Sequence, residues 1–150
     1  MGLFSKRPNN EQQVYIKSTI NEVQTQYKQV ATTTRVDWFL ESYKRTYSLM
    51  EDLLNVEKKY PTYFGNQSPS FNMKKIKSER AEMETQFVDR FILSIEKKLL
   101  NYSTARGKRN NFNKEVDKFK FYADEFLPET IDYFNKTLNE HFAEYVQFSE

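Results

Sequence analysis

Hydrophobic residues recur along the chain at alternating spacings of three and four, a pattern that predicts helices with one buried face. Residues 1–10 are polar and read as a disordered tail. From Glu11 the first apolar stripe crosses a segment rich in Gln, Asn and Thr. Its members are Ile16, Ile20, Val23, Tyr27 and Val30. The β-branched run at 32–34 weakens the helix, and Thr34 can cap the next one.

A second helix is predicted over about 35–59, and it is apolar on two faces. The first face carries Val36, Leu40, Tyr43, Tyr47, Met50 and Leu54. The other face carries Trp38, Leu49, Leu53 and Val56. A helix that is apolar on both sides is either central in its bundle or covered by a partner.

Pro61, Gly65 and Pro69 indicate a loop, after which Ser68 and Pro69 suit the cap and first position of a third helix over about 70–102. Its apolar arc contains Met73, Ile76, Met83, Phe87, Phe91, Ile95 and Leu99. Gly107 is expected to stop this helix.

A fourth helix is predicted from about Asn110, and Pro128 shifts its apolar stripe by one residue, which indicates a kink or break. The expected fold is therefore all-α: a single domain over 11–150, built as an up-down antiparallel bundle of four helices. If the run at 32–34 stays helical, three helices result instead.

Composition narrows the functional classes. With no cysteine among 150 residues, thiol catalysis and thiolate metal sites are excluded, and a reducing cytoplasm is a compatible location. Neither a signal-peptide core nor an apolar run of about 18 residues is found, so a soluble cytoplasmic protein is expected.

No catalytic, cofactor or metal site is predicted. His141 is the only histidine and stands on an apolar stripe, which favours a core or boundary position. Glu79, Glu82 and Glu84 alternate with basic residues and read as a solvated face.

The charge is distributed unevenly along the chain. Segment 97–120 holds eight basic and two acidic residues, whereas segment 121–150 holds seven acidic residues and Lys136. The best anion-binding candidates are Arg106, Lys108, Arg109 and Lys114. The alternative is that these residues complement the dipole at a helix C-terminus.

Phe121 is predicted to point away from the apolar stripe of its helix, between Lys118, Lys120 and Tyr122. Such an aromatic could stack on a nucleobase or cover another helix or subunit, and the second reading is preferred. The candidate interface is therefore Trp38, Leu49, Leu53, Val56 and Phe121.

Antiparallel pairing of the second and third helices would bring Arg35 and Asp37 level with Asp89 and Arg90. A crossed, partly buried ion-pair cluster is expected there, with a role in helix register.

Four segments, 34–39 (TRVDWF), 87–91 (FVDRF), 107–110 (GKRN) and 127–131 (LPETI), resemble uncharacterised helical proteins of low-GC Gram-positive bacteria. The resemblance covers most of the chain past residue 32 and implies a bacterial, cytoplasmic, helical protein without implying a substrate. The leading functional hypothesis is a non-enzymatic protein-interaction module, self-associating through the second face of its second helix. The alternative is binding of nucleic acid or an anionic surface through residues 106–120.

Overall fold

The computed structural model describes residues 7–146, and over this range the chain is helical with no β-strand. The α-helices are α1 (Asn10–Thr32), α2 (Val36–Lys59), α3 (Pro69–Ser78), α4 (Arg80–Leu99), α5 (Ala105–Phe121), α6 (Pro128–His141) and α7 (Ala143–Val146). A 3₁₀ turn, η1 (Ala123–Glu125), lies between α5 and α6. The all-α prediction is confirmed. The predicted tail falls partly on residues 1–6, which lie outside the described range.

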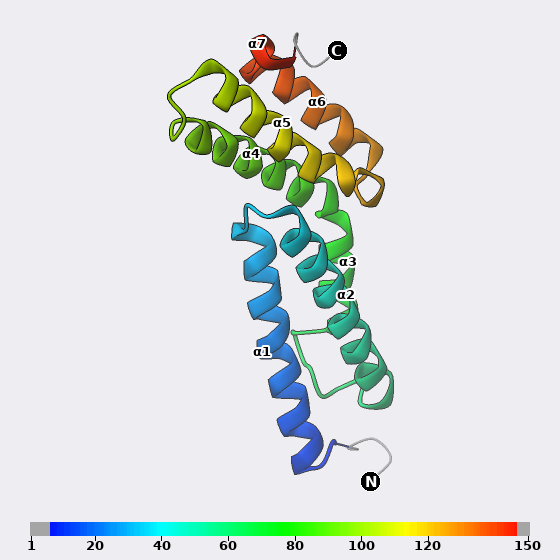
Figure 1. Ribbon diagram of the computed structural model, residues 1–150. Coiled ribbons are helices and arrows are strands. Elements are labelled where there is room, and N and C mark those ends of the chain that lie inside the picture. Colours follow the sequence, from blue (N-terminus) through cyan, green and yellow to red (C-terminus); the bar gives the residue numbers. More distant parts are fainter. Residues whose placement is uncertain (1–6, 147–150) are drawn as a thin grey trace.

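The helices form two groups that follow one another along the molecule (Figure 1). α1, α2 and α3 lie side by side in one half, and α4, α5 and α6 lie side by side in the other. α3 and α4 are consecutive, with α4 inclined across the ends of α1 and α2. A bundle of four helices is not confirmed, because the described residues form seven helices and the predicted third helix is divided between the two groups.

The division of the predicted third helix occurs at Ser78 and Glu79. The hydroxyl of Ser78 donates to the carbonyl oxygen of Lys75 at 2.8 Å, a local bond that competes with helix continuation. Glu79 has φ −91° and ψ 0°, and its carboxylate accepts a 2.9 Å hydrogen bond from the hydroxyl of Tyr27 on α1. Burial, reinforced by this bond, raises the pKa of Tyr27 to about 12. The bend is thus fixed by contacts with α1.

The connection between α1 and α2 is non-helical at residues 33–35, so the two helices are separate. Thr34 does not cap α2 as predicted: Arg35 occupies the N-cap, and its backbone N–H donates to the hydroxyl of Thr33 at 3.1 Å. On the other side, the guanidinium of Arg90 donates to the carbonyl oxygens of Val30 and Thr33 at 2.7 and 3.0 Å. Arg90 therefore satisfies carbonyl groups that the end of α1 leaves unpaired.

Two predicted helix boundaries are confirmed, whereas the fourth predicted helix begins at Ala105 rather than near Asn110. Ser68 caps α3 with Pro69 in its first turn, and α6 begins at Pro128 after the 3₁₀ turn. The prediction for Gly107 is wrong: α4 ends at Leu99, and Gly107 lies in the first turn of α5, where its N–H donates to the hydroxyl of Thr104 at 3.0 Å. Because Thr104 caps the N-terminus of α5, Gly107 lies inside this helix and does not end the preceding one.

Phenylalanine rings fill the place where the two groups of helices meet. Phe39 of α2 stacks on Phe87 of α4 with centroids 4.6 Å apart, and both rings contact Phe126. The ring of Phe119 on α5 lies between those of Phe126 and Phe134 of α6, with centroid distances of 4.7 and 3.8 Å. All five are buried, and the core they belong to runs from Ile16 of α1 to Phe142 after α6. This packing brings the start of α2 against α4 and α5, where the candidate site lies.

Candidate functional site

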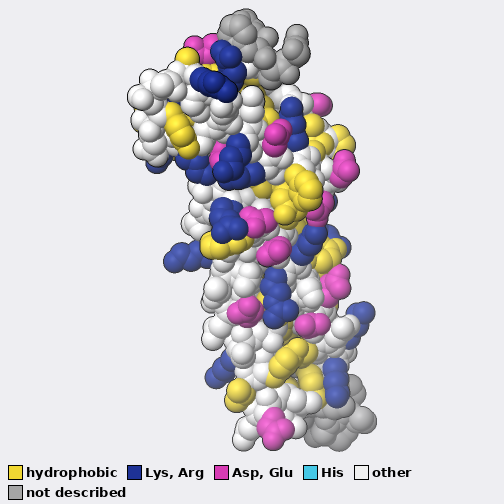
Figure 2. Space-filling model, viewed as in Figure 1, with side chains coloured by type: hydrophobic (Ala, Val, Ile, Leu, Met, Phe, Trp, Pro, Cys, Tyr) yellow, Lys and Arg dark blue, Asp and Glu magenta, His cyan; other side chains and the backbone are white. Residues whose placement is uncertain are grey.

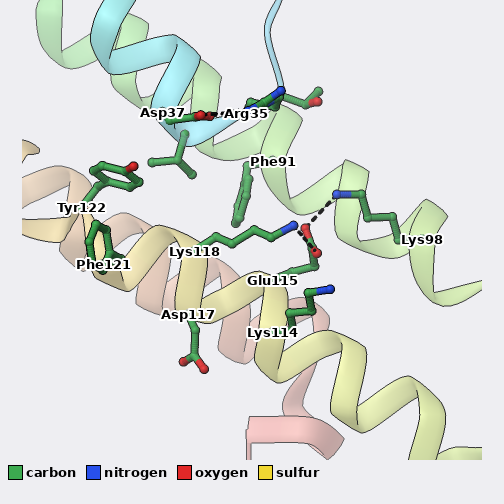
Figure 3. Close-up of a pocket in the computed structure, with 12 residues that line it drawn as sticks. Arg35, Asp37, Phe91, Lys98, Lys114, Glu115, Asp117, Lys118, Phe121 and Tyr122 are labelled. Carbon is green, nitrogen blue, oxygen red and sulfur yellow. Dashed lines mark hydrogen bonds and ion pairs between the residues drawn. The ribbon is translucent and has the colours of Figure 1, made fainter.

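A groove of about 720 Å³ lies between the start of α2, the middle of α4 and the second half of α5 (Figure 3). Its walls are charged and its inner part is apolar. The lining residues are Thr34, Arg35, Val36, Asp37, Phe91, Lys98, Lys114, Glu115, Asp117, Lys118, Phe121 and Tyr122. Three segments far apart in the sequence therefore build one surface feature.

The apolar part of the groove is continuous with the core. Phe91 is buried on α4 and points toward α5, and Val36 is buried at the first position of α2 (Figure 3). α5 ends at Phe121, followed by the half-buried Tyr122, and these two rings meet edge to face with centroids 4.9 Å apart. Phe121 is 81% exposed, so a large aromatic surface is accessible to solvent at one end of the groove.

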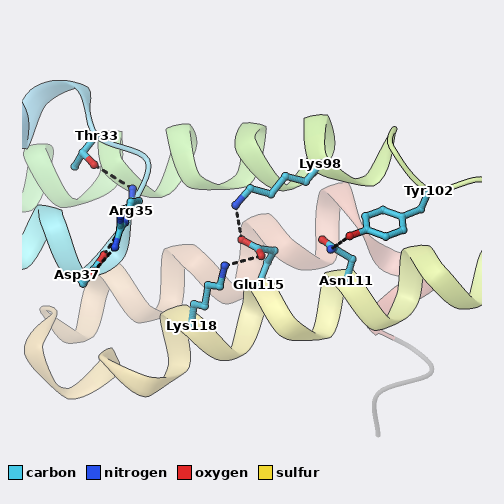
Figure 4. A network of polar contacts seen from close by, with 8 residues as sticks. All are labelled: Thr33, Arg35, Asp37, Lys98, Tyr102, Asn111, Glu115 and Lys118. Carbon is cyan, nitrogen blue, oxygen red and sulfur yellow. Dashed lines mark hydrogen bonds and ion pairs between the residues drawn. The ribbon is translucent and has the colours of Figure 1, made fainter.

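Glu115 organises the charged wall formed by α4 and α5. Its carboxylate is 2.8 Å from Nζ of Lys98 and 2.8 Å from Nζ of Lys118 (Figure 4). Burial by itself raises the pKa of Glu115, but the hydrogen bonds from Lys118 and Lys98 outweigh that effect and lower the pKa below its ordinary value. The carboxylate thus stays ionised although its side chain is only 4% exposed.

This pairing predicts a pH dependence of stability. Because the pKa of Glu115 is lowered in the folded state, its contribution is present above pH 4.5, the ordinary value, and is lost as the pH falls through the folded-state pKa. Urea unfolding of the wild type and of Glu115→Gln should therefore show a difference in unfolding free energy that is constant above pH 4.5 and shrinks below it. Glu51→Gln, on the exposed surface of α2, is the control and should show no such trend. A Glu115→Gln difference that persists unchanged in acid would contradict the assignment.

The opposite wall is formed by Arg35 and Asp37 at the start of α2. The guanidinium contacts both carboxylate oxygens, at 2.8 and 3.2 Å, and lies 4.2 Å from the ring centroid of Trp38. The hydrogen bond from Arg35 is the main cause of the lowered pKa of Asp37. This wall is therefore locally neutral, because the charges of Arg35 and Asp37 neutralise each other.

The predicted crossed ion-pair cluster is wrong. Arg35 and Asp37 pair with each other rather than with α4. Asp89 accepts a 2.6 Å hydrogen bond from the hydroxyl of Tyr133, and Arg90 binds the carbonyl oxygens at the end of α1. The prediction assumed that the second and third helices run level over their full length, whereas α4 leaves α2 after the bend at Glu79.

The predicted interface is only partly available to a partner. Leu49 and Leu53 are buried within the chain and Val56 is half-buried, so the second face of α2 is largely covered by the protein itself. Trp38 is 44% exposed, and Phe121 is exposed as predicted. The structure joins Phe121 to the groove and leaves Trp38 beside it, stacked on Arg35.

The predicted anion-binding residues lie on α5 between residues 106 and 114. Arg106 is exposed, and Lys108 and Arg109 are half-buried, in the first turns of the helix rather than after its C-terminus. The dipole alternative therefore does not apply to them, since cations are favoured at the other helix end. Lys114 is exposed and lines the groove.

Two buried carboxylates were missed from the sequence. Glu84 was assigned to a solvated face but is 3% exposed, and Glu115, also 3% exposed, was counted only as one of the acidic residues of segment 97–120. Their spacing carried a signal: Glu84 precedes Phe87 by three residues, and Glu115 follows Phe112 by three. Both therefore lie within the apolar arcs of their helices.

His141 lies at the surface rather than in the core, with Nδ1 3.0 Å from Oε1 of Glu96. Among residues 7–146 no three histidine, aspartate or glutamate side chains are grouped as metal ligands. Within the same range, no helix combines the length and apolar character needed to cross a membrane.

Comparisons with protein-family models, with curated proteins and with solved structures give no match to this chain. They do not bear on the resemblance to helical proteins of Gram-positive bacteria. The groove between α2, α4 and α5 is the feature of the described residues that points to a function.

Proposed function

We propose that the chain is a non-enzymatic helical interaction module that binds a segment of a partner protein in the groove between α2, α4 and α5. The observation that carries this proposal is the exposed ring of Phe121 at the end of an open groove with an apolar floor. Exposed aromatic residues beside a concave apolar surface are typical anchors of protein–protein contacts. The lack of cysteine fits a reducing compartment, and we place the module in a bacterial cytoplasm.

The charges of the groove favour a protein partner over nucleic acid. Four cationic residues and the three carboxylates of Asp37, Glu115 and Asp117 line the groove, so its net charge is small, whereas a nucleic-acid site needs a continuous basic surface along the phosphate backbone. Figure 2 shows that basic and acidic side chains are interspersed around the hydrophobic patches on this face. Self-association through the second face of α2 loses its support, since Leu49 and Leu53 are already buried.

Selection of groove-binding peptides tests the proposal. Phage-displayed random peptides are selected on the whole protein, and the enriched peptides are synthesised and titrated by fluorescence anisotropy. Phe121→Ala is expected to weaken their binding by about tenfold or more, the effect of removing an aromatic anchor. Phe71→Ala on α3 is the matched control, since this phenylalanine is also exposed but lies far from the groove, and it should change affinity by less than about twofold.

Two results would overturn the proposed function. One is the absence of any peptide enriched over selection on the bare support. The other is a set of enriched peptides that bind wild type and Phe121→Ala equally, because their site would then lie elsewhere.

A further inference from the structure

We infer that the partner segment is acidic, and that it places a carboxylate between Lys98, Lys114 and Lys118 next to an apolar side chain on Phe121. This inference rests on the proposed function and names the chemistry of the partner. It follows from the excess of cations on one wall, the accessibility of these cations, and the presence of an exposed aromatic ring in the same groove.

The first step is the charge balance at Glu115. One carboxylate is paired with two ammonium groups, so the Lys98–Glu115–Lys118 triad carries a net positive charge. Each lysine has three donors and gives only one bond to Glu115. Lys114 stands one helical turn before Lys118 on α5 and lines the same groove. Asp117 points away from this group in Figure 3 and does not neutralise it.

The two lysines that pair with Glu115 are accessible to a partner. The side chains of Lys98 and Lys118 are 46% and 50% exposed, whereas Glu115 is 4% exposed. A partner therefore reaches the two ammonium groups and not the carboxylate that holds them. Because Glu115 already restricts both lysines, less side-chain entropy is lost when a second carboxylate binds them.

The third step is the absence of competing repulsion from the facing wall. Asp37 is the carboxylate on that wall, and both its oxygens are bound by Arg35. The Arg35–Asp37 pair thus adds little net charge, and the field of the groove is set by the lysines. A carboxylate is favoured there over an ammonium group.

The last step is the spacing of the two features. Lys118 and Phe121 are three residues apart on α5 and lie on neighbouring turns, with Cβ atoms about 5–6 Å apart. The side chain of Lys118 extends from α5 toward Lys98, away from the ring of Phe121, so one partner side chain contacts the ammonium groups and a different one packs on the ring (Figure 3). The partner motif is an Asp or Glu within about two helical turns of an aromatic or aliphatic residue.

The test uses the peptides selected above. In peptides whose binding requires Phe121, acidic residues within about two helical turns of an apolar residue are expected to be enriched. Changing the acidic residue to its amide should weaken binding to the wild type by about fivefold, the upper range for a partly exposed ion pair. The same change should have a smaller effect on Lys114→Gln, whereas Lys74→Gln on α3, an exposed lysine far from the groove, should behave as wild type.

Each alternative outcome is distinguishable. Phe121-dependent peptides that lack acidic residues, or that tolerate the amide, would overturn the inference and leave the proposed function standing. Equal amide effects on wild type and Lys114→Gln would also overturn it, because the carboxylate would then bind elsewhere. Single-stranded oligothymidylate is tested as a competitor of the peptides. If it binds more tightly than they do and its binding requires Phe121, the ligand is an anionic polymer rather than an acidic protein segment.

Discussion

Glu84→Ala is expected to lower the free energy of unfolding by about 3 kcal/mol, because it removes a buried carboxylate that joins α4 to α6. Oε1 accepts hydrogen bonds from the backbone N–H of Leu127 at 3.0 Å and from the hydroxyl of Thr130 at 2.6 Å. Oε2 accepts from Nε of Arg80 at 3.0 Å. Leu127, the N-cap residue of α6, has no side-chain cap, so Glu84 supplies the negative charge favoured at that helix N-terminus.

Thr130 provides the internal check of this prediction. After Glu84→Ala its hydroxyl stays buried without its acceptor, which accounts for part of the loss. Adding Thr130→Val removes that hydroxyl, so the double variant should lose less than the sum of the two single variants. Glu82→Ala, an exposed change on the same helix, should alter stability by less than about 0.5 kcal/mol in the same urea titrations. A Glu84→Ala effect as small as that of Glu82→Ala would contradict the assigned role.

The local features of this fold were predictable because they depend on neighbouring residues. Phe87, Phe91 and Ile95 follow helical spacing, and all three are buried as the stripe predicts. The start of α3 at Ser68 and Pro69 was likewise predictable from a short segment of the sequence. Such signals need no knowledge of distant chain segments.

The failures that changed the arrangement of the helices depend on distant contacts. Arg90 has an aspartate beside it in the sequence, yet its partners are carbonyl groups about sixty residues earlier, at the end of α1. The bend at Glu79 is held by Tyr27, and no local pattern shows which side chain will meet the bend. Once α4 turns away from α2, the register assumed for the ion-pair cluster no longer exists.

The candidate groove was predictable only in fragments. Phe121 and Lys114 were singled out separately, one for its exposure and one for its charge, whereas Arg35 and Asp37 were assigned to a different feature. Their meeting requires that α4 cross the ends of α1 and α2 and carry α5 with it. Glu115 is paired with Lys98 from the preceding helix, and the spacing that places Glu115 in an apolar arc does not show which cation will meet it.

The other large effect is expected for Phe87→Ala, which should reduce the free energy of unfolding by about 4 kcal/mol. Phe87 has no exposed surface. Its ring centroid lies 4.6 Å from that of Phe39 on α2, 5.8 Å from that of Phe91 and 6.2 Å from that of Phe126. Removing this ring opens a cavity where the two groups of helices meet, and the surrounding rings can close it only in part. Phe121→Ala, which truncates an exposed ring, should cost less than about 0.5 kcal/mol.

Thermal unfolding followed by circular dichroism and by near-ultraviolet absorbance tests whether both groups depend on this shared core. A single transition, moved to lower temperature in Phe87→Ala and unchanged in Phe121→Ala, is the expected result. Two separate transitions, of which Phe87→Ala shifts only one, would show that α1–α3 and α4–α6 unfold independently. The stacked contact of Phe39 with Phe87 argues for one transition, because it places side chains from both groups in the same buried cluster.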